Sequence, residues 1–147
     1  MTSDVQEKPM NALVASVQLP HVSDIEFDAS LAELRELAKT LGYQVVETFV
    51  QKRASFDTTG YLGIGKRQEI ADFASHTADC EIDALLVDHE ISPSQARNLE
   101  KETGCGVMDR TMVILEIFHR NARSRAAKAQ VEIARLGYMA PRLREAA

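Results

Sequence analysis

A glycine-rich segment from Gly60 to Arg67 carries the residue types of a phosphate-binding loop. Gly60 and Gly65 are separated by four residues and Lys66 follows, which is the spacing at which backbone amides and a lysine contact nucleotide phosphates. The next position of such a loop is Ser or Thr, whose hydroxyl holds Mg²⁺, and in this chain it is Arg67. The chain also contains no Asn-Lys-x-Asp motif for recognition of a guanine base. We therefore expect no hydrolytic site in this segment.

Two interpretations of the segment remain open. It forms either a glycine-rich turn or a cradle of backbone amides and basic side chains that binds the phosphates of a nucleotide or of RNA. The residues of such a cradle would be Gly60, Gly63, Gly65, Lys66 and Arg67.

A second candidate is the tripeptide Asp88-His89-Glu90, which follows a predicted buried strand. These residue types could bind a metal or perform acid–base chemistry. However, neighbouring side chains at a strand end point in different directions, and no second cluster of ligands accompanies them. We expect a solvated turn here, and we assign no catalytic residue and no metal site to the chain.

Basic residues are concentrated in the C-terminal part of the chain. The formal net charge is -5, but residues 1–109 hold 9 Lys/Arg against 19 Asp/Glu, whereas residues 110–147 hold 8 against 3. Arginine suits phosphate recognition because its planar fork donates two hydrogen bonds at once. A solvated helix face is the alternative for these residues. The candidate RNA contacts are Lys52, Arg53, Lys66, Arg67, Arg110, Arg120, Arg123, Arg125, Lys128 and Arg135.

The same C-terminal part carries an apolar stripe at helical spacing. Such a stripe is a packing surface for another helix more often than a cofactor site. Covering it would be favourable by several kcal/mol, at ~25 cal/mol per Å² of apolar surface. We expect a homodimer in which the C-terminal helices pack together or are exchanged. The stripe consists of Phe118, Ala122, Ala126, Ala129, Ile133 and Leu136.

The elements that must position these residues alternate between strand and helix. Capping patterns begin helices at Ser23 and at Ser92, and short β-rich runs precede and follow each helix. The alternation predicts an α/β fold with a four-stranded, mostly parallel sheet, crossover helices and sites at the carboxyl ends of the strands. Residues 111–139 are expected to form one long helix that Pro141 closes. We divide the chain into a flexible tail (1–11), an α/β domain (12–110) and a helical arm (111–147).

The composition is that of an ordinary globular protein, with 45% hydrophobic and 27% charged residues. No apolar run approaches the ~20 residues that a membrane span needs, and residues 1–8 lack the basic start and apolar centre of a signal peptide. Cys80 and Cys105 form no metal or disulfide pattern. We expect a cytoplasmic protein with reduced thiols and no membrane partner.

Four segments in order resemble the N-terminal region of the HflX family of ribosome-associated GTPases. The resemblance covers about residues 12–144, with a departure from the family pattern around Ser124-Arg125-Ala126. The four segments are Thr59–Lys66, Ile91–Lys101, Asp109–Phe118 and Lys128–Leu143.

The resemblance implies an α/β subdomain followed by an arm of two long antiparallel helices and then a GTPase domain. It also implies binding to the large ribosomal subunit through ribosomal RNA, and the N-terminal region of the family has been linked to ATP. GTP and Mg²⁺ belong to the full-length family, and we expect no cofactor in this chain. We expect these 147 residues to hold only the first arm helix, so the chain would not be a GTPase by itself. An anchoring domain for ribosomal RNA is the leading hypothesis; a nucleotide-binding α/β module that uses Gly60–Arg67 and a helix-mediated assembly module are the alternatives.

Overall fold

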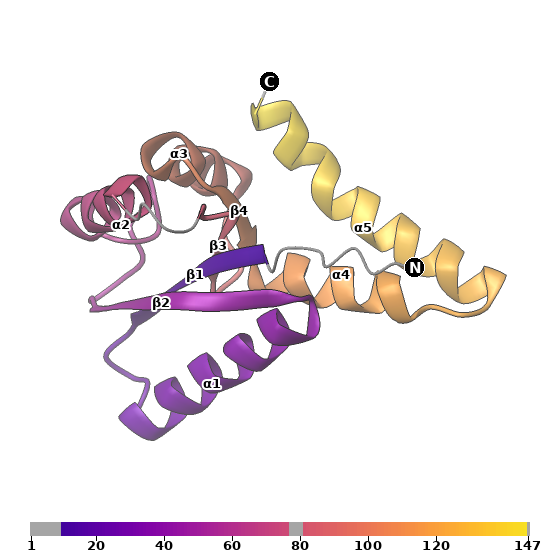
Figure 1. The fold of residues 1–147 in the computed structure, drawn as a ribbon, viewed down its shortest axis with the longest axis horizontal. Coiled ribbons are helices and arrows are strands. Elements are labelled where there is room, and N and C mark those ends of the chain that lie inside the picture. Colours follow the sequence, from indigo (N-terminus) through magenta and orange to yellow (C-terminus); the bar gives the residue numbers. More distant parts are fainter. Residues whose placement is uncertain (1–9, 77–80, 147) are drawn as a thin grey trace, which may run out of the picture.

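A parallel four-stranded sheet forms the centre of the computed structural model, which describes residues 10–76 and 81–146. Its strands are β1 (Met10–Gln18), β2 (Tyr43–Lys52), β3 (Ala84–Val87) and β4 (Gly106–Asp109), in the order β2-β1-β3-β4. All three strand pairs are parallel (Figure 1). The predicted α/β class is therefore confirmed. The expected tail lies mainly outside the described residues, but Met10 and Asn11 belong to β1.

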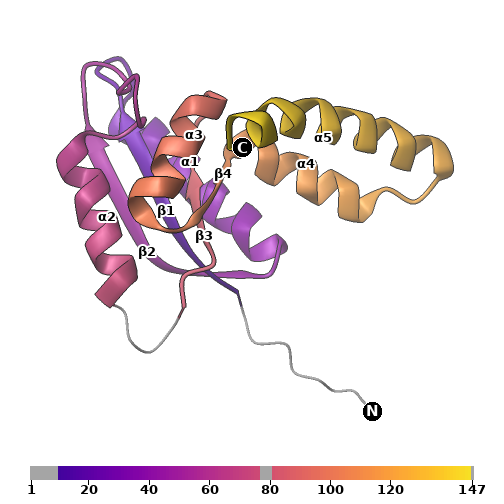
Figure 2. The same ribbon diagram turned by 90° about the horizontal axis from the view of Figure 1, so that it is seen from above.

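Helices cover both faces of the sheet (Figure 2). On one face α1 (Asp24–Thr40) and α4 (Arg110–Asn121) bury Leu34 and Val113 against the even-numbered residues of β1. On the other face α2 (Ile64–His76) and α3 (Pro93–Thr103) bury Ile70 and Leu99 against the odd-numbered ones. β1 is thus buried on both sides, which explains its continuous apolar sequence.

Local sequence signals set the ends of α1 and α3. Ser23 and Ser92 each accept a hydrogen bond from the amide three residues later, at 3.1 Å in both cases, and the Glu or Gln side chain at that position accepts one from the amide of the capping serine. Gly42 and Gly104 follow the two helices with φ of +92° and +75°, which favour glycine. Both capping boxes predicted from the sequence are confirmed.

The C-terminal part forms two helices instead of the single helix expected over residues 111–139, and that prediction was wrong. α4 ends at Asn121, Ala122 is extended, and α5 (Arg125–Ala146) runs back antiparallel to α4. The Ser124 hydroxyl accepts a hydrogen bond from the amide of Ala127 at 3.0 Å and so caps the new helix. Pro141 lies inside α5 and does not end it. The predicted long C-terminal helix exists, but it begins at Arg125.

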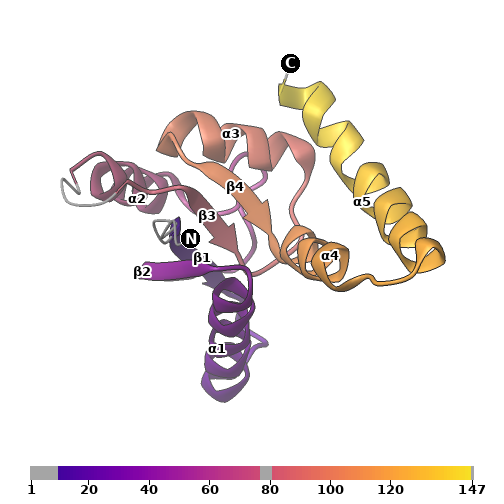
Figure 3. The ribbon, with the colours of Figure 1, turned by 45° about the vertical axis from the view of Figure 1, so that its right-hand side comes forward.

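α5 packs against α4 and α3 and lies on the side of the sheet where β4 is the edge strand (Figure 3). Of the two cysteines, Cys105 is a buried free thiol and Cys80 lies outside the described residues. Within residues 10–76 and 81–146, no helix has the length and hydropathy needed to span a membrane.

Candidate nucleic-acid interface

The crevice between the carboxyl ends of β1 and β3 is where an open parallel sheet of this order usually binds its ligand. In this protein Tyr61 fills that crevice. Its ring is fully buried, and its hydroxyl accepts a hydrogen bond from the amide of Val17 at 3.1 Å. Burial raises the pKa of Tyr61, so the hydroxyl stays protonated and donates a hydrogen bond to Nδ1 of His89 at 2.5 Å. The aromatic ring of Phe56 packs against both rings.

Asp88 faces the α1 side of the same strand end and is also fully engaged. It is 3% exposed, its Oδ2 accepts a hydrogen bond from the Ser30 hydroxyl at 2.7 Å, and its Oδ1 pairs with Arg110. Burial raises the pKa of the Asp88 carboxyl and lowers the pKa of His89. The expectation of a solvated turn therefore fails for Asp88 and for the half-buried His89. No cluster of metal-ligating side chains occurs in the part of the chain that the structure describes.

The amides in the first half of the glycine loop are not available to a phosphate. The amide of Gly60 donates to Asp57 Oδ2 at 2.8 Å, and the amide of Gly63 donates to Gln51 Oε1 at 2.8 Å. The amides of Tyr61 and Leu62 donate to backbone carbonyls within the loop. A phosphate-binding loop needs these groups free and convergent. Of the two interpretations left open, the geometry supports the structural turn.

The buried side chain of Arg67 fills the space inside this loop. This side chain is 5% exposed and lies between Asp57, at 3.5 Å, and Glu102 of α3, at 2.9 Å. A Cβ atom at Gly60 would lie 2.2 Å from Nη1 of Arg67, so the glycine gives the guanidinium its space. Lys66 pairs with Glu69 at 3.1 Å. Arg67 is therefore buried structure, and we remove it from the candidate phosphate and RNA contacts.

Two more of the candidate basic residues are held in ion pairs. Arg110 binds Asp88 and Glu33, and Arg135 binds Glu116 and Glu132. These pairs fasten α4 to α1 and α5 to α4. Because their charges are balanced within the fold, Arg110 and Arg135 contribute little to attraction of a polyanion.

The connection between α4 and α5 gathers basic residues that remain available. From Ile117 to Val131 the chain has no acidic residue, and Arg123, Arg125 and Lys128 are exposed. Arg120 is exposed as well and donates one hydrogen bond to the carbonyl of Leu41. The connection projects from the body of the molecule (Figure 1). We call residues 119–128 the basic tip.

Lys52 and Arg53 lie at the opposite end of the molecule from the basic tip. Lys52 ends β2 and Arg53 follows it at the carboxyl edge of the sheet, whereas the basic tip projects beyond the amino edge (Figure 1). Arg53 donates to the carbonyl of Ser55 at 2.9 Å, and Lys52 is exposed. The structure thus divides the sequence-predicted basic residues between two ends and does not bring them into one patch.

A cluster around Asp109 was not predicted as a unit. Its carboxylate accepts a hydrogen bond from the amide of Met112 at 2.9 Å and another from the Tyr138 hydroxyl, and it pairs with Arg142 at 3.3 Å. Arg142 also lies 3.7 Å from the centre of the Tyr138 ring and donates to the carbonyl of Ile91. This cluster fixes the second half of α5 to the start of α4. Asp109, Tyr138 and Arg142 all lie within the segments that resemble the family. Their sequence positions alone did not indicate that the three side chains would be in contact.

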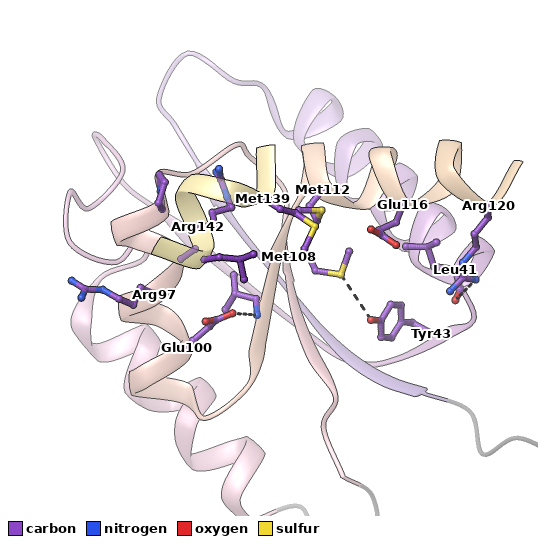
Figure 4. Close-up of a pocket in the computed structure, with 14 residues that line it drawn as sticks. Leu41, Tyr43, Arg97, Glu100, Met108, Met112, Glu116, Arg120, Met139 and Arg142 are labelled. Atoms are coloured by element: carbon purple, nitrogen blue, oxygen red, sulfur yellow. Dashed lines mark hydrogen bonds between the residues drawn. The ribbon is translucent and has the colours of Figure 1, made fainter. Parts of the chain in front are cut away.

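A cavity of about 300 Å³ lies between α5 and the β4 edge. Met108, Met112 and Met139 lie together in it, with Tyr43 and Arg120 at one end and Arg97 and Glu100 at the other (Figure 4). The Tyr43 hydroxyl donates a hydrogen bond to the sulfur of Met108 at 3.9 Å. Sequence analysis did not anticipate this cavity, because its walls come from five separate elements.

Comparison with known proteins gives a consistent result. Residues 28–119 match the family described as "GTP-binding GTPase N-terminal". The chain is 44% identical to GTPase HflX of Gluconacetobacter diazotrophicus, over 91% of this chain and 37% of that protein. It is 34% identical to GTPase HflX of Escherichia coli, over 90% of this chain and 30% of that protein. The chain thus spans about a third of the length of these curated relatives.

A solved structure with a similar fold is the GTP-binding protein from Sulfolobus solfataricus in complex with GDP. It is 27% identical, with a TM-score of 0.63, over 92% of this chain and 39% of that chain. The similarity therefore extends over nearly the whole chain.

Proposed function

Because the chain belongs to the GTP-binding GTPase N-terminal family found in the HflX proteins, we propose that it anchors an HflX-type GTP-binding protein to the large ribosomal subunit through ribosomal RNA. The basic tip is the observation that carries this proposal. It holds four exposed cations, Arg120, Arg123, Arg125 and Lys128, in a segment without any acidic residue. Phosphates dominate the affinity of proteins for RNA, and exposed arginines bind them bidentately.

The shape of the molecule supports the same proposal. A projecting helical hairpin can reach a groove or a loop of folded RNA that a flat sheet edge cannot reach. The remainder of the chain is acidic, with a net charge of -10 over residues 1–109. A polyanion would therefore be repelled by the α/β body and attracted by the basic tip, which orients the protein on the ribosome in the cytoplasm.

The Gly60–Arg67 loop is a poor fit for GTP and Mg²⁺, which the longer HflX relatives would bind. The amides of Gly60 and Gly63 are bonded within the protein, and Arg67, which pairs with Glu102, stands where a phosphate-binding loop has its metal-binding hydroxyl. We propose that GTP binding by an HflX-type protein uses residues outside this chain. Titration calorimetry with GTP or ATP and Mg²⁺ would contradict this view if it showed binding that Lys66→Ala weakens.

The test of ribosome binding is co-sedimentation with purified large subunits at ~50 mM monovalent salt, where phosphate contacts are strong. We expect the wild-type chain to sediment with the subunits. The variant Arg123→Ala/Arg125→Ala should bind at least ~10-fold more weakly, since two charge-assisted phosphate contacts are lost.

The matched control is Lys39→Ala/Lys101→Ala, which removes two exposed positive charges from α1 and α3. It should bind as the wild type does. Absence of wild-type binding at low salt would reject the proposed function. Equal weakening by both double variants would reject the basic tip as the interface and leave only a general charge effect.

A further inference from the structure

The cavity of about 300 Å³ beneath α5 has the properties of a small-molecule site. Ligand pockets in proteins have volumes of about 300–1,000 Å³, mainly apolar walls and a few polar groups that fix the orientation of the ligand. The walls of this cavity come from residues 41–143, and the Asp109 cluster and the Arg135–Glu116 pair hold α5 over it. We call it the methionine cavity.

Three methionines form the middle of the methionine cavity. Met108 comes from β4, Met112 from α4 and Met139 from α5, and their side chains lie together (Figure 4). Methionine is unbranched and adapts to the shape of a ligand, and its sulfur makes favourable contacts with aromatic rings. The middle of the cavity therefore suits a flat aromatic group.

One end of the cavity offers hydrogen-bond donors without a strong acceptor. The hydroxyl of Tyr43 donates to the sulfur of Met108, and a thioether is a weak acceptor. Burial raises the pKa of Tyr43, so this hydroxyl stays a neutral donor at physiological pH. Arg120 lies at the same end (Figure 4). Among the described residues its guanidinium donates only to the carbonyl of Leu41, at 3.0 Å, which leaves further N–H groups for a ligand.

The acidic groups that line the cavity are already engaged. Glu116 pairs with Arg135 at 2.5 Å, and Glu100 accepts a hydrogen bond from a backbone amide of β4 at 3.0 Å. At the end where Glu100 lies, the side chain of Arg97 points away from the methionines (Figure 4). The positive charge of Arg120 therefore favours a ligand whose anionic group lies at the opposite end, where Arg120 itself is.

We propose that the methionine cavity binds a small aromatic carboxylate. The ring system would lie against Met108, Met112 and Met139. The carboxylate would accept hydrogen bonds from the Tyr43 hydroxyl and the Arg120 guanidinium, and such charge-assisted bonds are stronger than neutral ones. This site goes beyond ribosome binding, and its test contains no RNA.

The apolar stripe predicted from the sequence does not contribute to the cavity. Phe118 belongs to α4 and Ala122 is its C-cap, whereas the other four members lie on α5, so the stripe is divided between two helices. None of the six residues lines the methionine cavity. Homodimerisation through the stripe stays a prediction, and ligand binding in the cavity can be tested separately from it.

NMR of a chain labelled with ¹³C-methyl methionine tests the proposal, with 2-naphthoate as the probe. The chain has five methionines, of which three line the cavity, so Met10 in β1 is an internal control. We expect saturable shifts of the three cavity methyl signals with a Kd below ~1 mM, and no shift of the Met10 signal. The cation 2-naphthylmethylammonium has the same rings and should bind at least ~10-fold more weakly, because Arg120 repels it.

Two variants and a matched control test the anchoring groups. Tyr43→Phe and Arg120→Gln should each weaken binding of 2-naphthoate at least ~5-fold, because each loses a hydrogen bond to a charged group. Lys39→Gln also removes one positive charge, from the last turn of α1, but Lys39 does not line the cavity. This variant should bind 2-naphthoate as the wild type does.

Three results would count against the site or its ligand. Absence of saturable shifts at ~5 mM 2-naphthoate would overturn the binding site. Shifts of Met10 as large as those of the cavity methionines would mean non-specific binding and would overturn it as well. Equal affinity for the ammonium compound, or equal weakening by Lys39→Gln and Arg120→Gln, would overturn the assignment of a carboxylate.

Discussion

Gly60 and Arg67 form a pair whose roles are coupled. The guanidinium of Arg67 fills the inside of the loop, and its charge is met by Asp57 and Glu102. Gly60 lines the space that the guanidinium occupies, and any side chain at this position would collide with the guanidinium. Gly65, by contrast, has no atom near the position of its missing Cβ and has no left-handed backbone. The two glycines of the apparent phosphate motif therefore have different reasons to be glycine.

This difference predicts opposite effects of the same substitution. Gly60→Ala should destabilise the fold by about 1–3 kcal/mol, because the new methyl group overpacks the loop against Arg67. Gly65→Ala should stabilise it by about 0.4–1 kcal/mol, because alanine restricts the unfolded chain without a clash. Urea unfolding monitored by circular dichroism measures both. Equal effects in the two variants would contradict the packing role of Gly60.

The lowered pKa of His89 predicts that the stability of the fold depends on pH. Its pKa is lowered from 6.5 by burial, so below about pH 6.5 the unfolded state binds a proton that the folded state resists. The free energy of unfolding should therefore fall as pH drops from ~7.5 to ~5.5. The variant His89→Asn retains an acceptor for the Tyr61 hydroxyl but cannot titrate, so it should lose less stability over this range.

Comparing the wild type with His89→Asn separates the effect of His89 on stability from that of Asp88. Asp88 has a raised pKa, so its contribution changes with pH in the opposite sense, but it is present in both proteins. Urea unfolding at three pH values is the measurement. A wild-type profile parallel to that of His89→Asn would exclude His89 as the titrating group.

At the residue scale, the sequence located the glycine-rich loop but did not predict that it is a structural turn around a buried arginine. The spacing of glycines and Lys66 resembles a phosphate site, and an arginine in a sequence is read as an exposed cation. Arg67 is buried because Glu102 arrives from a helix 35 residues later. Tyr61 likewise meets Val17 and His89 only after folding. Contacts between distant segments determine whether such side chains are buried or exposed, and a single sequence does not reveal these contacts.

At the scale of elements, the polar contacts that hold α5 to the domain among the described residues are the Asp109 cluster, the Arg135–Glu116 ion pair and a contact of 3.1 Å between His119 and Glu132. Asp109 caps α4, and its carboxylate also accepts a hydrogen bond from Tyr138 and pairs with Arg142 of α5. The cavity of about 300 Å³ beneath the same half of α5 leaves fewer apolar contacts there than in the core. Polar anchoring should therefore account for much of the position of this half-helix.

Arg142→Met tests this inference. The variant keeps the apolar stem but loses the donors to Ile91 and to Asp109. Hydrogen exchange of the second half of α5 should become at least ~10-fold faster, while exchange in β1 and β3 stays unchanged. Arg97→Met is the control, because Arg97 lines the same cavity and its buried Nε has no partner among the described residues. Unchanged exchange in α5 would mean that packing alone holds it.

Elements with local signals were predictable, and elements that depend on tertiary contacts were not. The capping boxes at Ser23 and Ser92 and the left-handed glycines specify α1 and α3 within a few residues of the chain. The break between α4 and α5 has only Ser124 as a local signal. Its position also depends on ion pairs that form when the chain has turned, such as Arg135 with Glu116. The apolar and basic residues of 111–136 thus suggested one uninterrupted helix.

At the scale of the whole molecule, charge is separated along the long axis. The basic tip lies at one end, Lys52 and Arg53 lie at the other, and the acidic body lies between them (Figure 1). The sequence shows the surplus of positive charge in residues 110–147 but not this geometry. The direction of α4, back along the sheet from the carboxyl end of β4, is what places the tip beyond the amino edge.

This separation predicts how salt affects ribosome binding by variants of the two ends. The logarithm of affinity falls with the logarithm of salt concentration with a slope of about -0.7 to -0.9 per phosphate contact. Arg123→Ala/Arg125→Ala should make the slope shallower by about 1.4–1.8, because two contacts are lost. Lys52→Ala/Arg53→Ala should leave the slope unchanged, because these residues lie at the end opposite the basic tip, to which we assign the phosphate contacts. Filter binding to large subunits between ~50 and ~200 mM salt measures both slopes. A shallower slope for the Lys52/Arg53 variant alone would move the interface to the carboxyl edge of the sheet.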